Sequence, residues 1–370
     1  MIALAAAAAA GCRRASPPPS ADPPPDAQVY PVARPAIRCA ECHGKMHTEW
    51  AASAHARSES SPLYRAMRHD SGDAAACDRC HAPLVGVVEP GEAVVHEGVT
   101  CEVCHTIDAV TERPSGGGFT MALRENIQRG PICDARDHYF HKMGCSPLHA
   151  ESRFCAACHN LVHGGLEVLT DVVEWRSSDY ADLLDCQDCH MPESTAEVAE
   201  GSPPRTGVSH HGYLGNAAIF RRALAGKLAA AVAGDKLEIE VLVRNVGAGH
   251  QVPGGIPGRQ LIVRVRALDA GGATLAQGER IYQRLLVDRL GRVVPFYRAE
   301  REASDNRLGP REQRLERFTL GAAAAHRVRL EILRRDLAPE IVGAVGQPPF
   351  DEVMIVSAEV PPGGATDWQQ

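Results

Sequence analysis

The stretch Gly98-Val99-Thr100-Cys101-Glu102-Val103-Cys104-His105 contains a pattern, Cys-x-x-Cys-His, that recurs through the first half of the chain. The five copies are Cys39-Ala-Glu-Cys42-His43, Cys77-Asp-Arg-Cys80-His81, Cys101-Glu-Val-Cys104-His105, Cys155-Ala-Ala-Cys158-His159 and Cys186-Gln-Asp-Cys189-His190. Multiplying the fractions of Cys and His in the chain gives about 0.02 copies expected by chance. Five copies therefore indicate a chemical requirement.

Each part of the pattern has a task in the covalent attachment of haem. Two thiols three residues apart form thioethers with the two vinyl groups of one haem, and the adjacent imidazole ligates its iron. The sequence thus predicts five covalent haems c, with one proximal ligand each from His43, His81, His105, His159 and His190. Zinc or disulfides are the alternatives, but neither explains a histidine directly after every second cysteine.

Composition agrees with a bound group that fills part of the interior. The chain of 370 residues has 13 cysteines and 17 histidines, while aromatic residues make up 5%. The net charge of −7 comes without a clustered basic stretch, which argues against nucleic acid as a partner.

The N-terminus predicts export. Residues 1–12 form a short apolar, alanine-rich segment ending in Gly11-Cys12, as in a lipoprotein signal with Cys12 as a possible lipid anchor. An ordinary cleaved signal peptide is the alternative. Residues 13–36 are rich in proline and predict a semi-rigid linker. We expect a periplasmic or outer-membrane lipoprotein.

The remaining chain changes texture once, which predicts an α+β multidomain fold. Residues 37–216 hold all five motifs between short helical stretches and predict a mainly α or irregular pentahaem domain. Residues 217–234 are rich in Ala, Leu, Arg and Lys and predict a connecting helix. Residues 235–362 alternate apolar and polar residues, which predicts an all-β, immunoglobulin-like sandwich of about seven strands. The clearest alternation lies in 236–245, 260–267, 327–333 and 352–360.

Two further patterns lie within the haem region. Cys133 and Cys145 are outside the motifs and predict a disulfide that closes a loop. The segment Glu49-Trp50-Ala-Ala-Ser-Ala-His55-Ala is weakly repeated as Glu174-Trp175-Arg-Ser-Ser-Asp-Tyr180-Ala, so the second copy has a tyrosine where the first has His55.

Several segments resemble the multihaem cytochromes c related to the tetrahaem cytochrome of ammonia oxidisers and to hydroxylamine oxidoreductase. They are Trp50-Ala-Ala-Ser-Ala-His55-Ala, Gly98-Val-Thr-Cys101-Glu-Val-Cys104-His105, Phe154-Cys155-Ala-Ala-Cys158-His159-Asn and Cys186-Gln-Asp-Cys189-His190-Met-Pro. The segments His211-Gly-Tyr-Leu-Gly and Asn245-Val-Gly-Ala-Gly-His250-Gln-Val-Pro-Gly-Gly are similar to members with a C-terminal β-domain.

The resemblance implies that His55 and His96 are distal ligands. His211, with its neighbour His210 as a competitor, His250 and His149 complete the expected set of five. For His55, His96 and His250, the alternative is a structural histidine that is hydrogen-bonded or exposed. His47, four residues after His43, lies on the same helical face and cannot ligate the same iron from the opposite side. His69, His138, His141 and His163 are held in reserve.

The count of distal ligands separates two functions. A second histidine on every iron favours an electron carrier that connects redox partner proteins, such as other cytochromes or a quinol-linked donor. The alternative, which the resemblance also implies, is an oxidoreductase that acts on a small nitrogen or sulfur compound at a haem with an open distal face. Side chains that would then assist proton transfer are Tyr180, Tyr139, His138 and Lys142. A gas sensor is a third class, without a signalling domain to support it.

Overall fold

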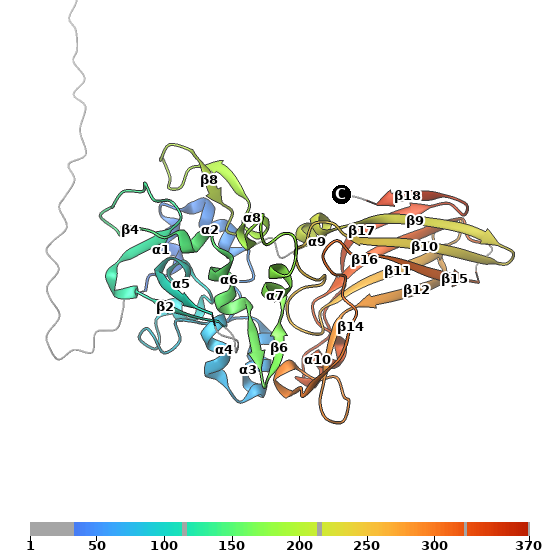
Figure 1. Cartoon of the computed structure of the whole chain (residues 1–370), viewed down its shortest axis with the longest axis horizontal. Coiled ribbons are helices and arrows are strands. Elements are labelled where there is room, and N and C mark those ends of the chain that lie inside the picture. The colour runs from blue at the N-terminus through green and yellow to red at the C-terminus, as the bar shows by residue number, and fades with distance from the viewer. Residues whose placement is uncertain (1–32, 113–116, 213–216, 322–323, 369–370) are drawn as a thin grey trace, which may run out of the picture.

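The computed structural model describes residues 33–112, 117–212, 217–321 and 324–368. The predicted signal segment 1–12, the anchor Cys12 and all but the last four residues of the linker 13–36 lie outside the described residues. Figure 1 shows two parts side by side, a first part of short helices and small sheets and a second part of long strands. No helix in the described ranges has the length and apolar character needed to cross a membrane.

Short helices carry the five motifs in the first part. The helices of this part are α1 (Ala36–Ala40), α2 (Gly44–Ala51), α3 (Pro62–Ser71), α4 (Ala74–His81), α5 (Cys101–Thr106), α6 (Ser152–His159), α7 (Asp171–Arg176) and α8 (Cys186–His190). Motif cysteines lie in α1, α4, α5, α6 and α8. Helices of this length are marginal in water, so their ends need side-chain caps. Ser61, Asp73 and Thr100 accept backbone N–H bonds at the starts of α3, α4 and α5, and Asp185 forms a capping box with Asp188 at α8.

The described residues of the first part also form four two-stranded sheets. The sequence predicts a mainly helical or irregular domain here and does not predict these strands. They are β1 (Ile107–Thr111) with β2 (Gly118–Met121), β3 (Ile127–Gly130) with β4 (Lys142–Cys145), β5 (Leu161–His163) with β6 (Leu166–Leu169), and β7 (Glu193–Ala196) with β8 (Arg205–Ser209). The predicted disulfide between Cys133 and Cys145 is confirmed. It closes the loop that leads from β3 into β4.

The second part consists of two four-stranded antiparallel sheets that share one core. One sheet has the order β15 (Gln313–Leu320), β10 (Lys236–Asn245), β9 (Leu224–Ala233), β18 (Ala365–Trp368), and the other β12 (Thr274–Tyr282), β11 (Gln260–Leu268), β16 (Arg327–Arg335), β17 (Val353–Val360). A hairpin of β13 (Arg284–Val287) and β14 (Arg301–Asp305) and the helices α9 (Ala217–Ala223) and α10 (Pro339–Ala344) complete this part. Inward-facing residues such as Leu228, Val241, Val263 and Leu330 are buried in a single cluster.

The four most regular alternating segments are confirmed as strands β10, β11, β16 and β17. The second and fifth strands of the two sheets pair with each other (β10 with β15), as do the third and sixth (β11 with β16). Immunoglobulin domains share this pairing. The assignment of the second part to that class stays a prediction.

The predicted connecting helix over 217–234 is wrong for its larger part. The helix α9 ends at Ala223, and Leu224–Ala233 form the central strand β9, which pairs with β10 on one side and β18 on the other. Alanine and leucine favour helix locally, but Leu224, Leu228 and Ala230 face the core at every second or fourth position. Burial and ladder hydrogen bonds outweigh an intrinsic preference of a few tenths of a kcal/mol per residue.

Polar contacts tie the two parts together. Arg284 on β13 donates to the carbonyl of Glu167 at 2.8 Å, the Tyr297 hydroxyl donates to Asp70 at 2.7 Å, and the Tyr180 hydroxyl donates to the carbonyl of Val246 at 2.9 Å. The helices α7 and α9 lie at this boundary (Figure 1).

The shared core of the two sheets predicts a large effect of a cavity at Leu228. Its side chain is fully buried, so Leu228→Ala should lower the free energy of unfolding of the second part by about 2–5 kcal/mol. Leu315→Ala in the same sheet, at a position that is 42% exposed, should cost about 0.5 kcal/mol. Calorimetry of the full chain measures both. Equal effects would contradict the core as described.

Candidate functional site

Each motif lies on a helix or on one helical turn, and this geometry gathers its three reactive groups. Residues at positions i, i+3 and i+4 share one face of a helix, so both thiols and the imidazole of a motif project together. Motif two lies wholly in α4 and motif five spans α8. In motif one, where α1 ends at Ala40, the N–H of His43 still bonds to the carbonyl of Cys39 at 2.8 Å.

Four of the five motif histidines face another histidine at a nearly constant distance. The ring centres are separated by 6.3 Å for His43 and His141, 6.1 Å for His159 and His55, 6.3 Å for His190 and His250, and 6.0 and 6.2 Å for His105 with His149 and His211. Two imidazoles on opposite sides of one metal, each with a bond of about 2 Å, have ring centres about 6 Å apart. The spacing therefore fits an iron between each pair.

Hydrogen bonds at Nδ1 orient several of these rings. The Nδ1 atoms of His43, His105, His211 and His250 lie 2.5, 2.6, 2.9 and 2.9 Å from backbone carbonyl oxygens. A carbonyl oxygen only accepts, so Nδ1 carries the proton and the lone pair at Nε2 is available to a metal. This donor set fits haem iron.

Desolvation lowers the pKa of several histidines at these sites, which favours the neutral form that ligation requires. Desolvation lowers the pKa of His55 to about 3. Desolvation is also the main cause of lowered pKa values at six further rings, to about 4 at His81, His149, His190 and His211, and by direction at His105 and His159.

His105 has two histidine neighbours, and their hydrogen bonds distinguish them. The Nε2 atom of His149 lies 2.9 Å from the carbonyl oxygen of Cys104, and its Nδ1 lies 2.9 Å from the Ser146 hydroxyl. An Nε2 that donates to a carbonyl has no lone pair for iron. His211, whose Nδ1 makes the carbonyl contact, is the better partner for His105.

The surroundings of His81 differ from those of the other four motif histidines. Its ring stacks on Tyr64 with ring centres 4.5 Å apart. The Tyr64 hydroxyl donates to Asp78 at 2.6 Å, and Arg68 binds both oxygens of the same carboxylate at 2.6 Å. Within the described ranges, no histidine ring is recorded as a stacking partner of His81.

His96, expected as a distal ligand, makes no ring contact with a motif histidine among the described residues. Its side chain is 66% exposed, and its Nδ1 is 3.6 Å from the carboxylate of Glu59. Instead the structure places His141, a reserve residue, opposite His43. The disulfide-closed loop 133–145 contains His141, and this constraint is the signal in the sequence that could have identified it.

Thiols from different motifs also meet. The interaction of the Cys39 and Cys101 thiols is the main cause that lowers the pKa of Cys39 and raises that of Cys101. The interaction of Cys80 with Cys158 likewise is the main cause that lowers the pKa of Cys80 to about 7 and raises that of Cys158. Cys186 and Cys155 form a third such pair, in which the pKa of Cys186 is lowered to about 7. Cys104 also acts electrostatically on Cys155 and Cys158, which links the third motif to the fourth, so each motif has a neighbour among the others.

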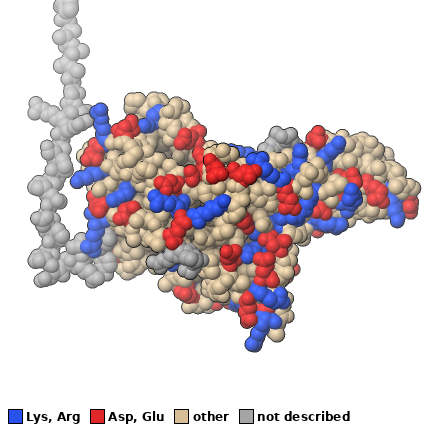
Figure 2. Space-filling view, viewed as in Figure 1, with Lys and Arg blue, Asp and Glu red and all other residues tan. Residues whose placement is uncertain are grey.

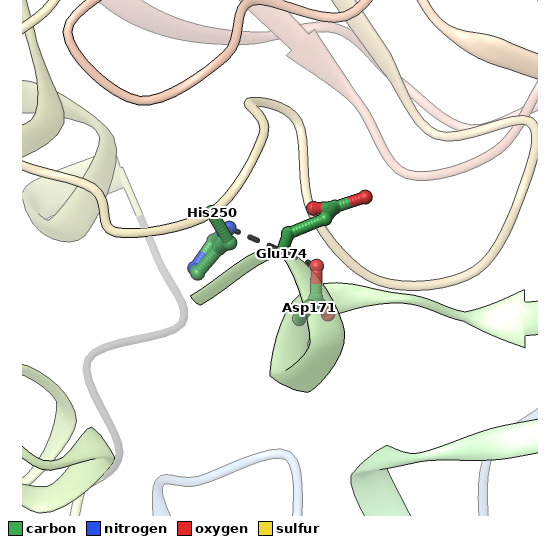
Figure 3. A group of neighbouring side chains, drawn as sticks. All are labelled: Asp171, Glu174 and His250. Carbon is green, nitrogen blue, oxygen red and sulfur yellow. Dashed lines mark ion pairs between the residues drawn. The ribbon is translucent and has the colours of Figure 1, made fainter. Parts of the chain in front are cut away.

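Two carboxylates lie beside His250. Asp171 and Glu174 project from α7, and His250 belongs to the loop after β10 that faces this helix (Figure 3). One ligand atom from each of the three side chains lies within 4.8 Å of the others. The Asp171 carboxylate is 3.7 Å from Nδ1 of His250. Because His250 also faces His190, we interpret these carboxylates as outer support for the histidine.

Of the four side chains expected to assist proton transfer in an enzyme, His138, Tyr139 and Lys142 lie close together in one segment and Tyr180 lies in another. Tyr180 binds the carbonyl of Val246, while His138 stacks on Tyr139, which is 76% exposed. Lys142 is the first residue of β4 and is exposed. The side chain that lies against the distinctive motif histidine, His81, is Tyr64, which the sequence did not single out.

Comparisons with known proteins agree with these observations. Residues 38–106, which include the first three motifs, match the family model for cytochrome c554 and c-prime. A solved structure, a penta-heme cytochrome c552 from Thermochromatium tepidum, is similar with a TM-score of 0.71 and 23% identity. The similarity covers 87% of this chain and 97% of that chain, so the likeness of fold includes strands of the second part. No curated protein matches the chain in sequence. Together these findings support a multihaem c-type cytochrome, a class of electron-transfer proteins that is typically exported.

The buried carboxylate of Asp78 predicts a pH dependence. The hydrogen bonds from Arg68 are the main cause that lowers its pKa below 3.8, against the opposing effect of burial. A lowered pKa in the folded state stabilises the protein above about pH 4, and this contribution is lost as the pH falls further. The melting temperature of Asp78→Asn should therefore depend less on pH between about 2 and 5 than that of the unaltered protein. Parallel pH profiles would show that Asp78 titrates normally.

Proposed function

We propose that the chain binds five haems c at its five Cys-x-x-Cys-His motifs and relays electrons between redox partner proteins. When bound, each haem supplies an iron that accepts and releases one electron. The observation that carries this proposal is the spacing of about 6 Å between motif histidines and second histidines at four motifs. Such a spacing is the one expected for two imidazoles that bind one iron from opposite sides.

Thioethers form at the ten motif cysteines, and the histidine of each motif is the proximal ligand. The distal ligands that the geometry supports are His141 for His43, His211 for His105, His55 for His159 and His250 for His190. His149 remains a competitor at His105. The lowered pKa values of His55, His105, His190 and His211 favour ligation over protonation at these rings.

The contacts between thiols order the attachment sites. The first motif adjoins the third through Cys39 and Cys101. The fourth motif adjoins the second through Cys158 and Cys80, and the fifth through Cys155 and Cys186. Cys104 of the third motif acts electrostatically on both thiols of the fourth. We therefore place the fourth motif at the branch point, because its two thiols interact with thiols of the second, third and fifth motifs. A path from motif one to motif five passes motifs three and four, with motif two on a side branch.

The second part of the chain supplies His250 and thereby braces the fifth attachment site. A ligand from a separate β-part makes haem attachment and the docking of the two parts interdependent. The proposal includes export, with Cys12 as a lipid anchor in the periplasm or at the outer membrane, and partners such as other cytochromes or a quinol-linked donor.

The surroundings of His81 favour a second candidate function at one motif. If no histidine completes the iron there, a small nitrogen or sulfur compound can bind, as in an oxidoreductase. Tyr64, Asp78 and Arg68 are then the polar groups beside the proximal ligand. The carrier remains our principal proposal because four of five sites are saturated in this arrangement.

Electron paramagnetic resonance of the oxidised full chain tests the ligand sets. We expect low-spin ferric signals from four haems and a separate signal from the haem at Cys77 and Cys80. Low-spin signals from all five would remove the second candidate function. High-spin signals from most haems would contradict the carrier.

Removal of single attachment sites tests the path. A photosensitiser on Ile37→Cys, a position that is 62% exposed beside motif one, injects electrons at that end. In the double variant Cys155→Ala, Cys158→Ala, which lacks the fourth haem, the electrons injected by a light flash should reduce only the haems of motifs one and three. The matched variant Cys77→Ala with Cys80→Ala, on the side branch, should still pass electrons to motif five. Equal behaviour of the two variants, each with four haems by mass, would contradict the branch point.

A further inference from the structure

The two Glu-Trp segments of the weak repeat have the same local structure. Trp50 donates its indole N–H to the carbonyl of Val99 at 2.8 Å, and Trp175 donates to the carbonyl of Leu184 at 3.1 Å. The backbone N–H three residues later bonds back to the tryptophan carbonyl in both copies, at 2.8 Å from Ser53 and 2.9 Å from Ser178. The repeat therefore exists in the fold as well as in the sequence.

The glutamates of the two copies also make the same contact. Glu49, on α2, is 13% exposed, and one of its oxygens accepts the backbone N–H of His211 at 2.8 Å. Glu174, on α7, is 12% exposed, and one of its oxygens accepts the backbone N–H of Gln251 at 2.9 Å. Each N–H lies at, or directly after, a histidine that faces a motif histidine. The partners are 162 and 77 residues away in sequence.

We propose that Glu49 and Glu174 are matched positioning residues, each of which fixes the backbone segment that presents a distal histidine, His211 or His250. The inference rests on the proposed function, because it takes both histidines as ligands. A charged acceptor strengthens a hydrogen bond to a backbone N–H, and a partly buried one does so more. Neither glutamate contacts the iron in this arrangement.

The second oxygen of each carboxylate is engaged separately. The other oxygen of Glu174 accepts from the Thr170 hydroxyl at 2.6 Å and from Arg307, which is 3% exposed, at 2.7 Å. The other oxygen of Glu49 faces His210 at 3.6 Å and Lys45 at 3.9 Å. A glutamine retains one acceptor oxygen and turns an N–H group towards the other donors. The Glu→Gln change is therefore a small but specific perturbation.

In the second copy of the repeat, the tyrosine that replaces the histidine contacts the loop that carries His250. Tyr180, at the position of His55, donates to the carbonyl of Val246 at 2.9 Å, and a Cβ on Gly249 would lie 3.1 Å from the Cβ of Tyr180. Asp171, which lies beside His250 in Figure 3, accepts the N–H of Gly255 at 2.9 Å. The second copy thus holds the loop 246–255 of the β-part along its length.

Cyanide binding and electron paramagnetic resonance of the oxidised full chain test the inference. Glu174→Gln should speed cyanide binding at one haem by about ten-fold or more, because the loop that carries His250 is released more often. Glu49→Gln should have the same effect at a different haem. Each variant should show a partial change of one low-spin signal. Glu112→Gln is the matched control, since it removes an exposed ion pair to Arg176 on the same helix α7 and should leave both readouts unchanged.

The variants His250→Ala and His211→Ala separate the two levels of the argument. If either alanine variant leaves the spectrum unchanged while all five haems are present by mass, the ligand assignment of the proposed function fails at that site. If the alanine variants change the spectrum but both glutamine variants behave as Glu112→Gln does, the positioning inference is overturned. A glutamine variant that alters its own haem alone supports it.

Discussion

One turn of helix is the constraint on which the first part of the molecule depends. It places two thiols and an imidazole on one face in every motif, and the helices need be no longer than five to eight residues for this purpose, as α8 and α4 show. Such helices are unstable alone, so caps from Ser61, Asp73, Thr100 and Asp185 define their starts. The motif histidine that this turn presents lies about 6 Å from a second histidine at four motifs, a distance that fits one metal between the two rings.

The two parts of the chain solve the problem of a stable interior differently. The first part has a small apolar cluster around Leu84, Val95 and Val103, whereas the second part has a continuous core between two sheets. In the proposed holoprotein, porphyrin supplies the apolar material that the first part lacks. His250 connects the two solutions, because a loop of the β-part reaches the fifth motif. Charged residues of both signs are interspersed over the face shown in Figure 2, without a single basic patch, as expected for a chain with a net charge of −7.

Patterns within a few residues of sequence predict the motifs, the disulfide and the regular strands, but they do not predict which distant segments pair. The motifs, the disulfide of Cys133 and the four most regular strands follow from spacing and alternation within a few residues. Strand β9 was mistaken for helix because its alanines owe their conformation to pairing with β10 and β18. The match of His141 with His43 depends on the folding of a loop about 100 residues away. The sequence likewise does not predict that the side chain of His96 is exposed, because its ion-pair partner Glu59 lies in a separate segment. Tyr64 at His81 is a contact across two helices that no spacing rule contains.

The central claim is that ten paired thiols hold five haems covalently. Intact mass spectrometry under denaturing conditions, on the full chain matured in a host that assembles c-type cytochromes, tests it most directly. We predict that the polypeptide retains the mass of five haems after unfolding. A mass equal to the processed polypeptide alone, or a gain that zinc explains, would contradict the account.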